Sequence, residues 1–116
     1  MTQLFLRIDF DPETRLGPGK IRLLELVGET GSISQAARRV DNMSYRRAWR
    51  LIDGLNDMFT EPLVTTKLGG SGGGGAEITP FGAELIRRYR DFERQATQLA
   101  AEHMAPFEAI RRKTGD

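Results

Sequence analysis

The chain has 116 residues, of which 39% are hydrophobic and 28% are charged, and its formal net charge is +1. This length suits one compact domain, and balanced charge with a globular share of apolar residues argues against a disordered chain. The apolar runs are short, which argues against a membrane span, and the N-terminus lacks a basic start, which argues against a signal peptide. The lack of cysteine excludes disulfides, thiolate metal sites and a cysteine nucleophile.

The first predicted element is a strand over residues 3–10, where apolar and polar side chains alternate with a period of two. The apolar residues from Leu4 to Phe10 fall on one side of it. A loop rich in proline and glycine follows. From Lys20 the apolar residues recur at helical spacing, and this pattern predicts a helix that ends within residues 28–31, where two glycines stand.

Two short helices joined by a tight turn are predicted next. Ser34 is the expected N-cap of the first, which runs to Val40, and Ser44 is the expected N-cap of the second, which runs to about Asn56. This arrangement is a helix-turn-helix. Residues 32–50 hold five arginines and one acid, a local charge of +4. Such a patch suits nucleic acid, although a solvated helical face carries the same signal.

The remaining elements are a hairpin and a long helix. Strand-like segments at 63–68 and 76–79 flank a glycine-rich run, and we expect the strand over residues 3–10 to join them in a three-stranded sheet. Thr79 is the expected cap of a helix of about 24 residues, or about 36 Å, with Pro80 at its first position. Its apolar residues recur at alternating spacings of four and three, which suits a helix–helix interface with a second copy of the chain. The alternative is that this apolar stripe packs onto its own domain.

The whole pattern predicts an α+β, mainly α, fold. Residues 1–79 are expected to form a winged helix-turn-helix with a small antiparallel sheet, and residues 80–116 a long C-terminal dimerisation helix of the same domain.

Three motifs together resemble the N-terminal DNA-binding domain of the ModE family of molybdate-responsive transcription regulators. They are Gly-Ser-Ile-Ser-Gln-Ala-Ala at 31–37, Ser-Tyr-Arg-Arg-Ala-Trp at 44–49, and the glycine run followed by Ala-Glu-Ile-Thr-Pro-Phe-Gly at 76–82. The resemblance covers roughly residues 19–100, and LysR-type regulators are more distantly similar.

The resemblance implies a winged helix whose second motif helix enters the major groove of DNA, and a dimer built with the long helix. The chain departs from the family in its N-terminal strand, where the family has a helix. The family's molybdate-binding part is a pair of small β-barrel domains, for which a chain ending at Asp116 has no room. We therefore expect binding to double-stranded DNA, no binding of molybdate, and no cofactor.

The arginines of the second motif helix are the leading candidates for DNA contact. Arg46 and Arg50 lie one turn apart. Arginine at such positions donates a pair of hydrogen bonds to guanine or binds a backbone phosphate. Which of the two arginines contacts a base stays open. The expected DNA-binding residues are Ser32, Ser34, Gln35, Ser44, Tyr45, Arg46, Arg47, Trp49, Arg50, Lys67, Gly72 and Gly73. The expected dimer contacts are Leu85, Tyr89, Phe92, Ala96 and Leu99.

Several of these residues also have a purely structural interpretation. Tyr45 and Trp49 stand at helical spacing, where an aromatic side chain usually belongs to the core. Ser34 serves equally well as a simple helix cap. The glycine run suits either a wing tip near DNA or disorder without function. The lone His103 is a packing or solvent-facing residue rather than a ligand.

Two functions of different classes remain open at this point. The first is a sequence-specific, dimeric DNA-binding transcription regulator in the cytoplasm, and the second is a winged-helix protein-interaction module that does not read DNA. The concentration of charge in residues 32–50 favours the first. No acid–base pair, nucleophile–base pair or metal-ligand set emerges, so an enzyme is not expected.

Overall fold

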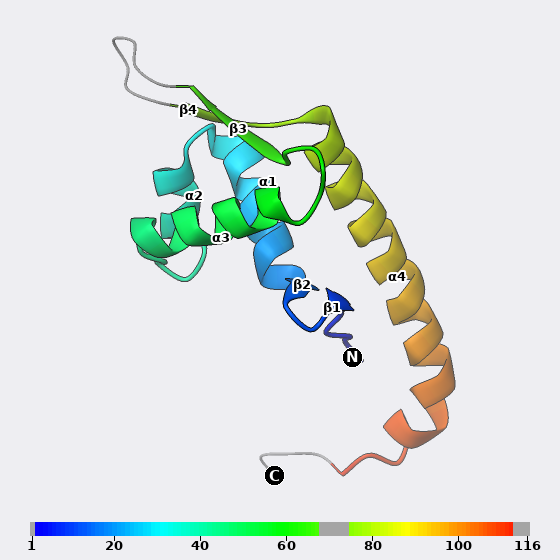
Figure 1. Ribbon diagram of the computed structural model, residues 1–116. Coiled ribbons are helices and arrows are strands. Elements are labelled where there is room, and N and C mark those ends of the chain that lie inside the picture. The colour runs from blue at the N-terminus through cyan, green and yellow to red at the C-terminus, as the bar shows by residue number, and fades with distance from the viewer. Residues whose placement is uncertain (1, 68–74, 113–116) are drawn as a thin grey trace.

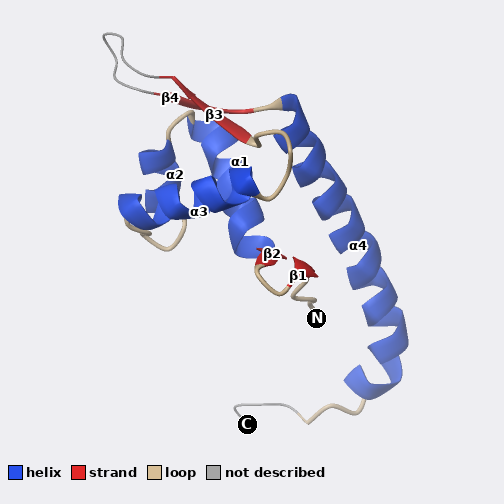
Figure 2. Ribbon diagram, in the orientation of Figure 1, coloured by secondary structure: helices blue, strands red, loops and turns tan. Residues whose placement is uncertain are grey.

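The computed structural model describes residues 2–67 and 75–112 of the chain. The elements are, in chain order, β1 (Ile8–Asp11), β2 (Thr14–Leu16), α1 (Pro18–Thr30), α2 (Ile33–Arg39), α3 (Tyr45–Asp57), β3 (Val64–Lys67), β4 (Gly75–Ile78) and α4 (Pro80–Glu108). Helix α1 lies in the middle, with α2 and α3 on one side and α4 on the other (Figure 1). The described residues thus form a mixed fold in which helix predominates, as the sequence predicts (Figure 2).

Helix α1 is the centre of the hydrophobic core. Its fully buried side chains are Ile21, Leu23, Leu24, Leu26 and Val27. Burial at adjacent positions means that more than one face of this helix is covered, and α2, β4 and α4 all contact it. The helix begins two residues earlier than predicted. It ends at Thr30, and the next residue, Gly31, adopts a left-handed φ of 69° that glycine tolerates without strain.

Helices α2 and α3 are joined by a turn whose geometry its residues favour. Asp41 and Asn42 both take positive φ angles, 48° and 52°, which short polar side chains tolerate best. The backbone N–H of Met43 then donates to the carbonyls of Ala37 and Val40, 2.9 and 3.0 Å away. The predicted pair of helices joined by a tight turn is therefore confirmed.

The helix caps agree with the sequence at α3 and differ at α2. Ser44 caps α3 as predicted, since its Oγ accepts from the backbone N–H of Arg47 at 3.1 Å. The prediction that Ser34 caps α2 is wrong. Ser32 caps it instead and accepts from the N–H of Gln35 at 3.2 Å. Starting the helix at Ile33 brings that apolar side chain into the core at 5% exposure.

The strands form two separate antiparallel hairpins, β1–β2 and β3–β4, and the predicted three-stranded sheet is wrong. The strand predicted over residues 3–10 is confined to Ile8–Asp11, and it pairs with Thr14–Leu16. The carboxylate of Asp11 accepts from the N–H of Glu13 at 2.8 Å, which stabilises the reversal. Pairing of β1 with β2 closes a very short loop, whereas pairing of β1 with β4 would close a long loop at a greater cost in chain entropy.

Helix α4 starts in close contact with the end of the loop that precedes β3. Thr79 caps it by accepting from the N–H of Gly82 at 2.9 Å, and Pro80 is its first residue, as predicted. A Cβ at Gly82 would lie only 2.4 Å from the carbonyl oxygen of Leu63, so this crossing requires glycine. The helix continues past Pro106 to Glu108. Among the described residues no helix combines the length and the hydropathy needed to cross a bilayer.

Candidate nucleic-acid interface

Helix α3 has one buried face and one strongly charged face. Ala48, Ile52 and Leu55 are buried at helical spacing against the core. The opposite face presents Arg46 and Arg50, one turn apart and exposed. Within the described residues neither guanidinium has a hydrogen-bond or ion-pair partner, so both keep all five N–H donors for a ligand.

The charge on the outer face of α3 changes sign along the helix. Arg46 and Arg50 occupy its first two turns, and Asp53 and Asp57 follow on the same side at the next helical positions. All four side chains belong to exposed residues. A polyanion is attracted to the first half of this helix and repelled from the second half. The candidate interface therefore lies around the N-terminal half of α3.

The two aromatic residues at the start of α3 lie in different environments. Their rings contact each other edge to face, with centroids 6.1 Å apart. Tyr45 is 55% exposed, whereas Trp49 is half-buried and packs against the core. Tyr45 thus stands beside the exposed arginines, and Trp49 supports it from within the fold.

The start of α2 brings three of the predicted site residues together. The hydroxyl oxygens of Ser32 and Ser34 are 3.5 Å apart, and Gln35 is exposed on the first turn. The Ser32 hydroxyl accepts the capping bond described above and also lies within hydrogen-bond distance of the Ser34 hydroxyl, so within the described residues the Gln35 side-chain amide is the polar group of this end that has no partner.

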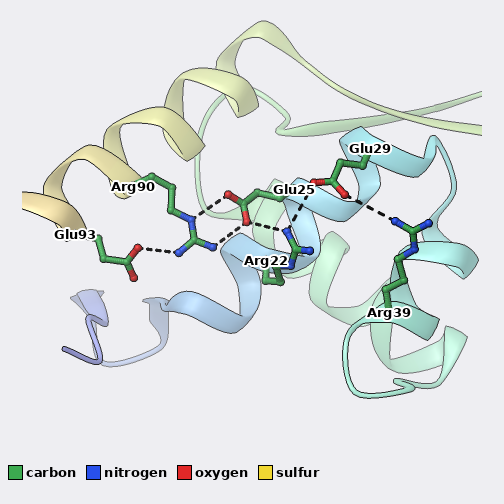
Figure 3. A network of polar contacts seen from close by, with 6 residues as sticks. All are labelled: Arg22, Glu25, Glu29, Arg39, Arg90 and Glu93. Atoms are coloured by element: carbon green, nitrogen blue, oxygen red, sulfur yellow. Dashed lines mark hydrogen bonds and ion pairs between the residues drawn. The ribbon is translucent and has the colours of Figure 1, made fainter. Parts of the chain in front are cut away.

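One arginine of the basic stretch belongs to a structural network instead. Arg39 pairs with Glu29 at 3.8 Å, and Glu29 also contacts Arg22, which in turn contacts Glu25 on α1 (Figure 3). Glu25 receives two hydrogen bonds from Arg90 of α4. These bonds hold the pKa of the Glu25 carboxyl below its ordinary value. The network joins α2, α1 and α4, and it includes none of the arginines of α3.

The base of the β3–β4 hairpin is fastened to the end of α3. The Asn56 side chain accepts from the N–H groups of Leu63 and Val64 at 2.8 and 3.1 Å, and donates to the Val64 carbonyl at 2.9 Å. Sequence reasoning missed this anchor, because a polar residue near a helix end usually faces water. Lys67 pairs across the hairpin with Glu77 at 2.8 Å, and this hydrogen bond raises the pKa of Lys67. The predicted contacts Gly72 and Gly73 lie outside the described residues.

The predicted dimer surface on α4 divides into exposed and buried parts. Phe92 and Leu99 are 51% and 54% exposed, and Ala96 is half-buried. Leu85 is half-buried against the core. Tyr89 is not a surface residue, in contrast to the prediction. Only 3% of it is exposed, because the N-terminal segment covers it and Leu6 accepts a hydrogen bond from its hydroxyl.

The sequence of the chain is similar to those of known regulatory and molybdenum-binding proteins. No family model matches the chain. It is 38% identical over 102 residues to the molybdenum-pterin-binding protein MopB of Rhodobacter capsulatus, which covers 84% of this chain and 37% of that protein. It is also 33% identical over 108 residues to the DNA-binding transcriptional dual regulator ModE of Escherichia coli, covering 93% of this chain and 40% of the regulator.

A third relative, the molybdenum transport protein ModE of Azotobacter vinelandii, is 41% identical over 88 residues, 76% of this chain and 32% of that protein. The chain is related to ModE and Mop proteins. The predicted resemblance to ModE regulators is thus confirmed at the level of sequence similarity. The chain spans about two fifths or less of the length of each of these three relatives.

Proposed function

We propose that this chain is the DNA-binding unit of a ModE-type transcription regulator and reads a specific DNA sequence. In this proposal the fold acts as a winged helix, with α3 in the major groove and the β3–β4 hairpin as the wing. The major groove admits one α-helix, and arginine recognises guanine O6 and N7 there. The observation that carries the proposal is the pair of exposed guanidinium groups of Arg46 and Arg50 at the start of α3, which have no partner among residues 2–67 and 75–112.

The other residues around α3 support the same assignment. In this proposal Tyr45, whose exposed ring lies next to Trp49 at the start of α3, contacts a sugar or a thymine methyl group. Ser34 and Gln35, at the start of α2, are suited to a backbone phosphate. The acidic second half of α3 directs the duplex toward the first half. The proposal assigns the chain no catalytic activity.

We further propose that the unit binds DNA as a dimer through α4. Phe92 and Leu99 are seven residues apart, so they lie on the same side of the helix, and each exposes half of its surface. A second copy of the same helix covers both side chains. Two-fold symmetry then presents two α3 helices to successive turns of the major groove, about 34 Å apart.

The related proteins carry two kinds of name, and we propose the DNA-binding kind for this chain. The Escherichia coli relative is named a DNA-binding regulator and the Rhodobacter capsulatus relative a molybdenum-pterin-binding protein. A protein-interaction module that retains the fold without reading DNA is the remaining alternative. Within the described residues Arg46, Arg47 and Arg50 of α3 have no acidic partner, and this concentration of cations supports DNA binding over a protein-interaction module.

The experiment is a binding titration against a duplex that the protein itself selects from a random-sequence pool. Arg46→Ala is expected to weaken binding to the selected duplex by about 1–3 kcal/mol if Arg46 contacts a base, and to relax sequence preference. Arg88→Ala is the matched control, because this arginine is exposed on α4, on the other side of α1. Unchanged affinity for selected and random duplexes in the double variant Arg46→Ala/Arg50→Ala would reject the proposal.

A further inference from the structure

A pocket of about 410 Å³ lies between the β1–β2 hairpin and the turn that precedes α3. Its lining includes four cationic side chains, those of Arg7, Arg15, Lys20 and Arg47, and the carboxylate of Asp41. The four cations come from three separate parts of the fold. Arg7 and Arg15 belong to the hairpin region, Lys20 to the first turn of α1, and Arg47 to the first turn of α3. The fold thus gathers cations that are far apart in sequence.

The cations of this pocket differ in how many donors they have left. Arg7 is engaged by Asp9 through two hydrogen bonds of 2.8 and 3.0 Å, so its charge is largely neutralised. Arg15 uses only its Nε, which donates to the carbonyl of Pro12 at 3.1 Å. Lys20 donates to the carbonyl of Arg15 at 2.7 Å and retains two further N–H donors.

Arg47 connects this pocket to the candidate interface. It follows Arg46 in the chain and lies on the side of α3 between the buried face and the exposed face of the helix. Its guanidinium has no hydrogen-bond partner within the described residues. Arg15, Lys20 and Arg47 therefore combine free donors around one pocket, against the single carboxylate of Asp41 in its lining as far as the structure describes it.

The position of the pocket relative to α3 indicates what it binds. The two hairpins lie at opposite ends of α1, with α2 and α3 between them (Figure 1). The β3–β4 end is fixed by a hydrogen bond from the N–H of Ala76 to the carbonyl of Gly31, 3.0 Å long. A helix in the major groove has a phosphate backbone on each side of it. The pocket borders α3 on the side away from the β3–β4 hairpin.

We propose that this pocket binds a backbone phosphate of DNA that flanks the sequence read by α3. The inference rests on the proposed function and adds a contact region, the N-terminal hairpin and the start of α1, that lies outside the helix pair and the wing. A phosphate contact fixes the position of the protein without distinguishing bases. It therefore raises affinity for all sequences equally.

The test is the salt dependence of DNA affinity, measured with the selected duplex and with a random-sequence duplex. Each lost phosphate contact reduces the slope of log affinity against log salt by about one. We expect Arg15→Gln and Lys20→Gln each to show this reduction with both duplexes and to weaken binding to both by the same factor. Arg88→Gln removes the same charge from α4 and is expected to leave the slope unchanged. Thermal melting of each variant identifies any loss of folding.

The outcomes separate this inference from the proposed function. If the wild-type chain binds DNA and the Arg46→Ala variant weakens it, while folded Arg15→Gln and Lys20→Gln keep the wild-type slope, the pocket is not a phosphate contact and the proposed function stands. If the wild-type chain binds neither duplex, both fail together. Saturable binding of inorganic phosphate that Arg15→Gln abolishes, without a change in the DNA slope, overturns the inference in favour of a site for a free oxyanion.

Discussion

Arg90 of α4 and Glu25 of α1 form a two-pronged ion pair, with Nε and one terminal nitrogen of the guanidinium donating to the two carboxylate oxygens at 2.9 and 2.8 Å. The side chains are only 29% and 22% exposed. Planar, paired geometry of this kind is the strongest form of the arginine–carboxylate interaction. The second terminal nitrogen of Arg90 donates to Glu93 at 2.8 Å. The pair therefore fixes the long helix against the core helix.

Replacing Arg90 with alanine is expected to destabilise the folded chain. The change leaves the half-buried Glu25 carboxylate without its main partner, which lowers the free energy of unfolding by about 1–3 kcal/mol. Denaturant unfolding measures this difference. The matched control is Arg88→Ala, since Arg88 has a 79% exposed side chain and pairs only with Glu84 among the described residues; it is expected to change stability by less than about 0.5 kcal/mol. Equal losses in the two variants would contradict the prediction.

The same pair predicts how stability depends on pH. Hydrogen bonds from Arg90, the largest cause, lower the pKa of Glu25 from its ordinary value of 4.5. A carboxyl with a lowered pKa stabilises the fold fully above its unfolded pKa, and this stabilisation disappears as the pH falls through the lower folded value. The difference in unfolding free energy between wild type and Arg90→Ala is therefore largest at neutral pH and narrows below pH 4.5. A difference that stays constant into the acid range would show that Glu25 does not mediate the effect.

Gly82 predicts a steric effect on the start of α4. Adding a Cβ there places it 2.4 Å from the backbone oxygen of Leu63, which is held by its own hydrogen bonds and cannot easily move. Gly82→Ala is expected to destabilise the chain by about 1–3 kcal/mol. Gly54→Ala in α3 is the control, because nothing lies within 4 Å of its Cβ position; helix propensity predicts stabilisation by about 0.5–1 kcal/mol. Thermal unfolding of the two variants should move in opposite directions.

The features that the sequence predicts correctly depend on residues close together in the chain. Ser44 and Thr79 cap their helices through bonds to the third residue on, and Asp41 with Asn42 adopts the turn that short polar residues favour. At α2, local rules allow either serine to act as the cap. Ser32 is the cap in the structure because a helix that starts at Ile33 buries the Ile33 side chain in the core, which is a tertiary effect.

The features that the sequence misses depend on contacts between distant segments. Tyr89 lies on the same helical stripe as Phe92, and only the path of the N-terminal segment past Leu6 determines that one is buried and the other exposed. Likewise, no spacing rule brings Arg15 and Lys20 to Arg47. The short hairpin between residues 8 and 16 does so, and its second strand has only three residues, too few to show an alternating pattern.

The exposed apolar residues of α4 predict a dimer that a single polar substitution weakens. Leu99→Gln removes an apolar contact from the proposed helix–helix interface while leaving the monomer intact, since half of this side chain is exposed in the single chain. Sedimentation should show a dimer for the wild type and a shift toward monomer for Leu99→Gln. Gln98→Ala, at an exposed neighbouring position, is expected to sediment like the wild type. A wild-type chain that remains monomeric at concentrations well above micromolar would refute this interface.

The last prediction is that this chain does not bind molybdate selectively, although one relative is named for molybdenum-pterin binding. A selective oxyanion site needs several convergent donors in an enclosed pocket. The donors that the described residues offer around Arg15 and Arg47 belong to exposed side chains next to the Asp41 carboxylate, where water and salt screen a small anion. Sulfate should therefore act much as molybdate does, and both should compete only weakly with DNA. Calorimetric titration of molybdate with and without excess sulfate measures this, with Arg15→Gln as the variant that removes the site. A saturable molybdate signal that excess sulfate leaves intact would contradict the prediction and would make the anion itself a candidate regulator of the proposed DNA binding.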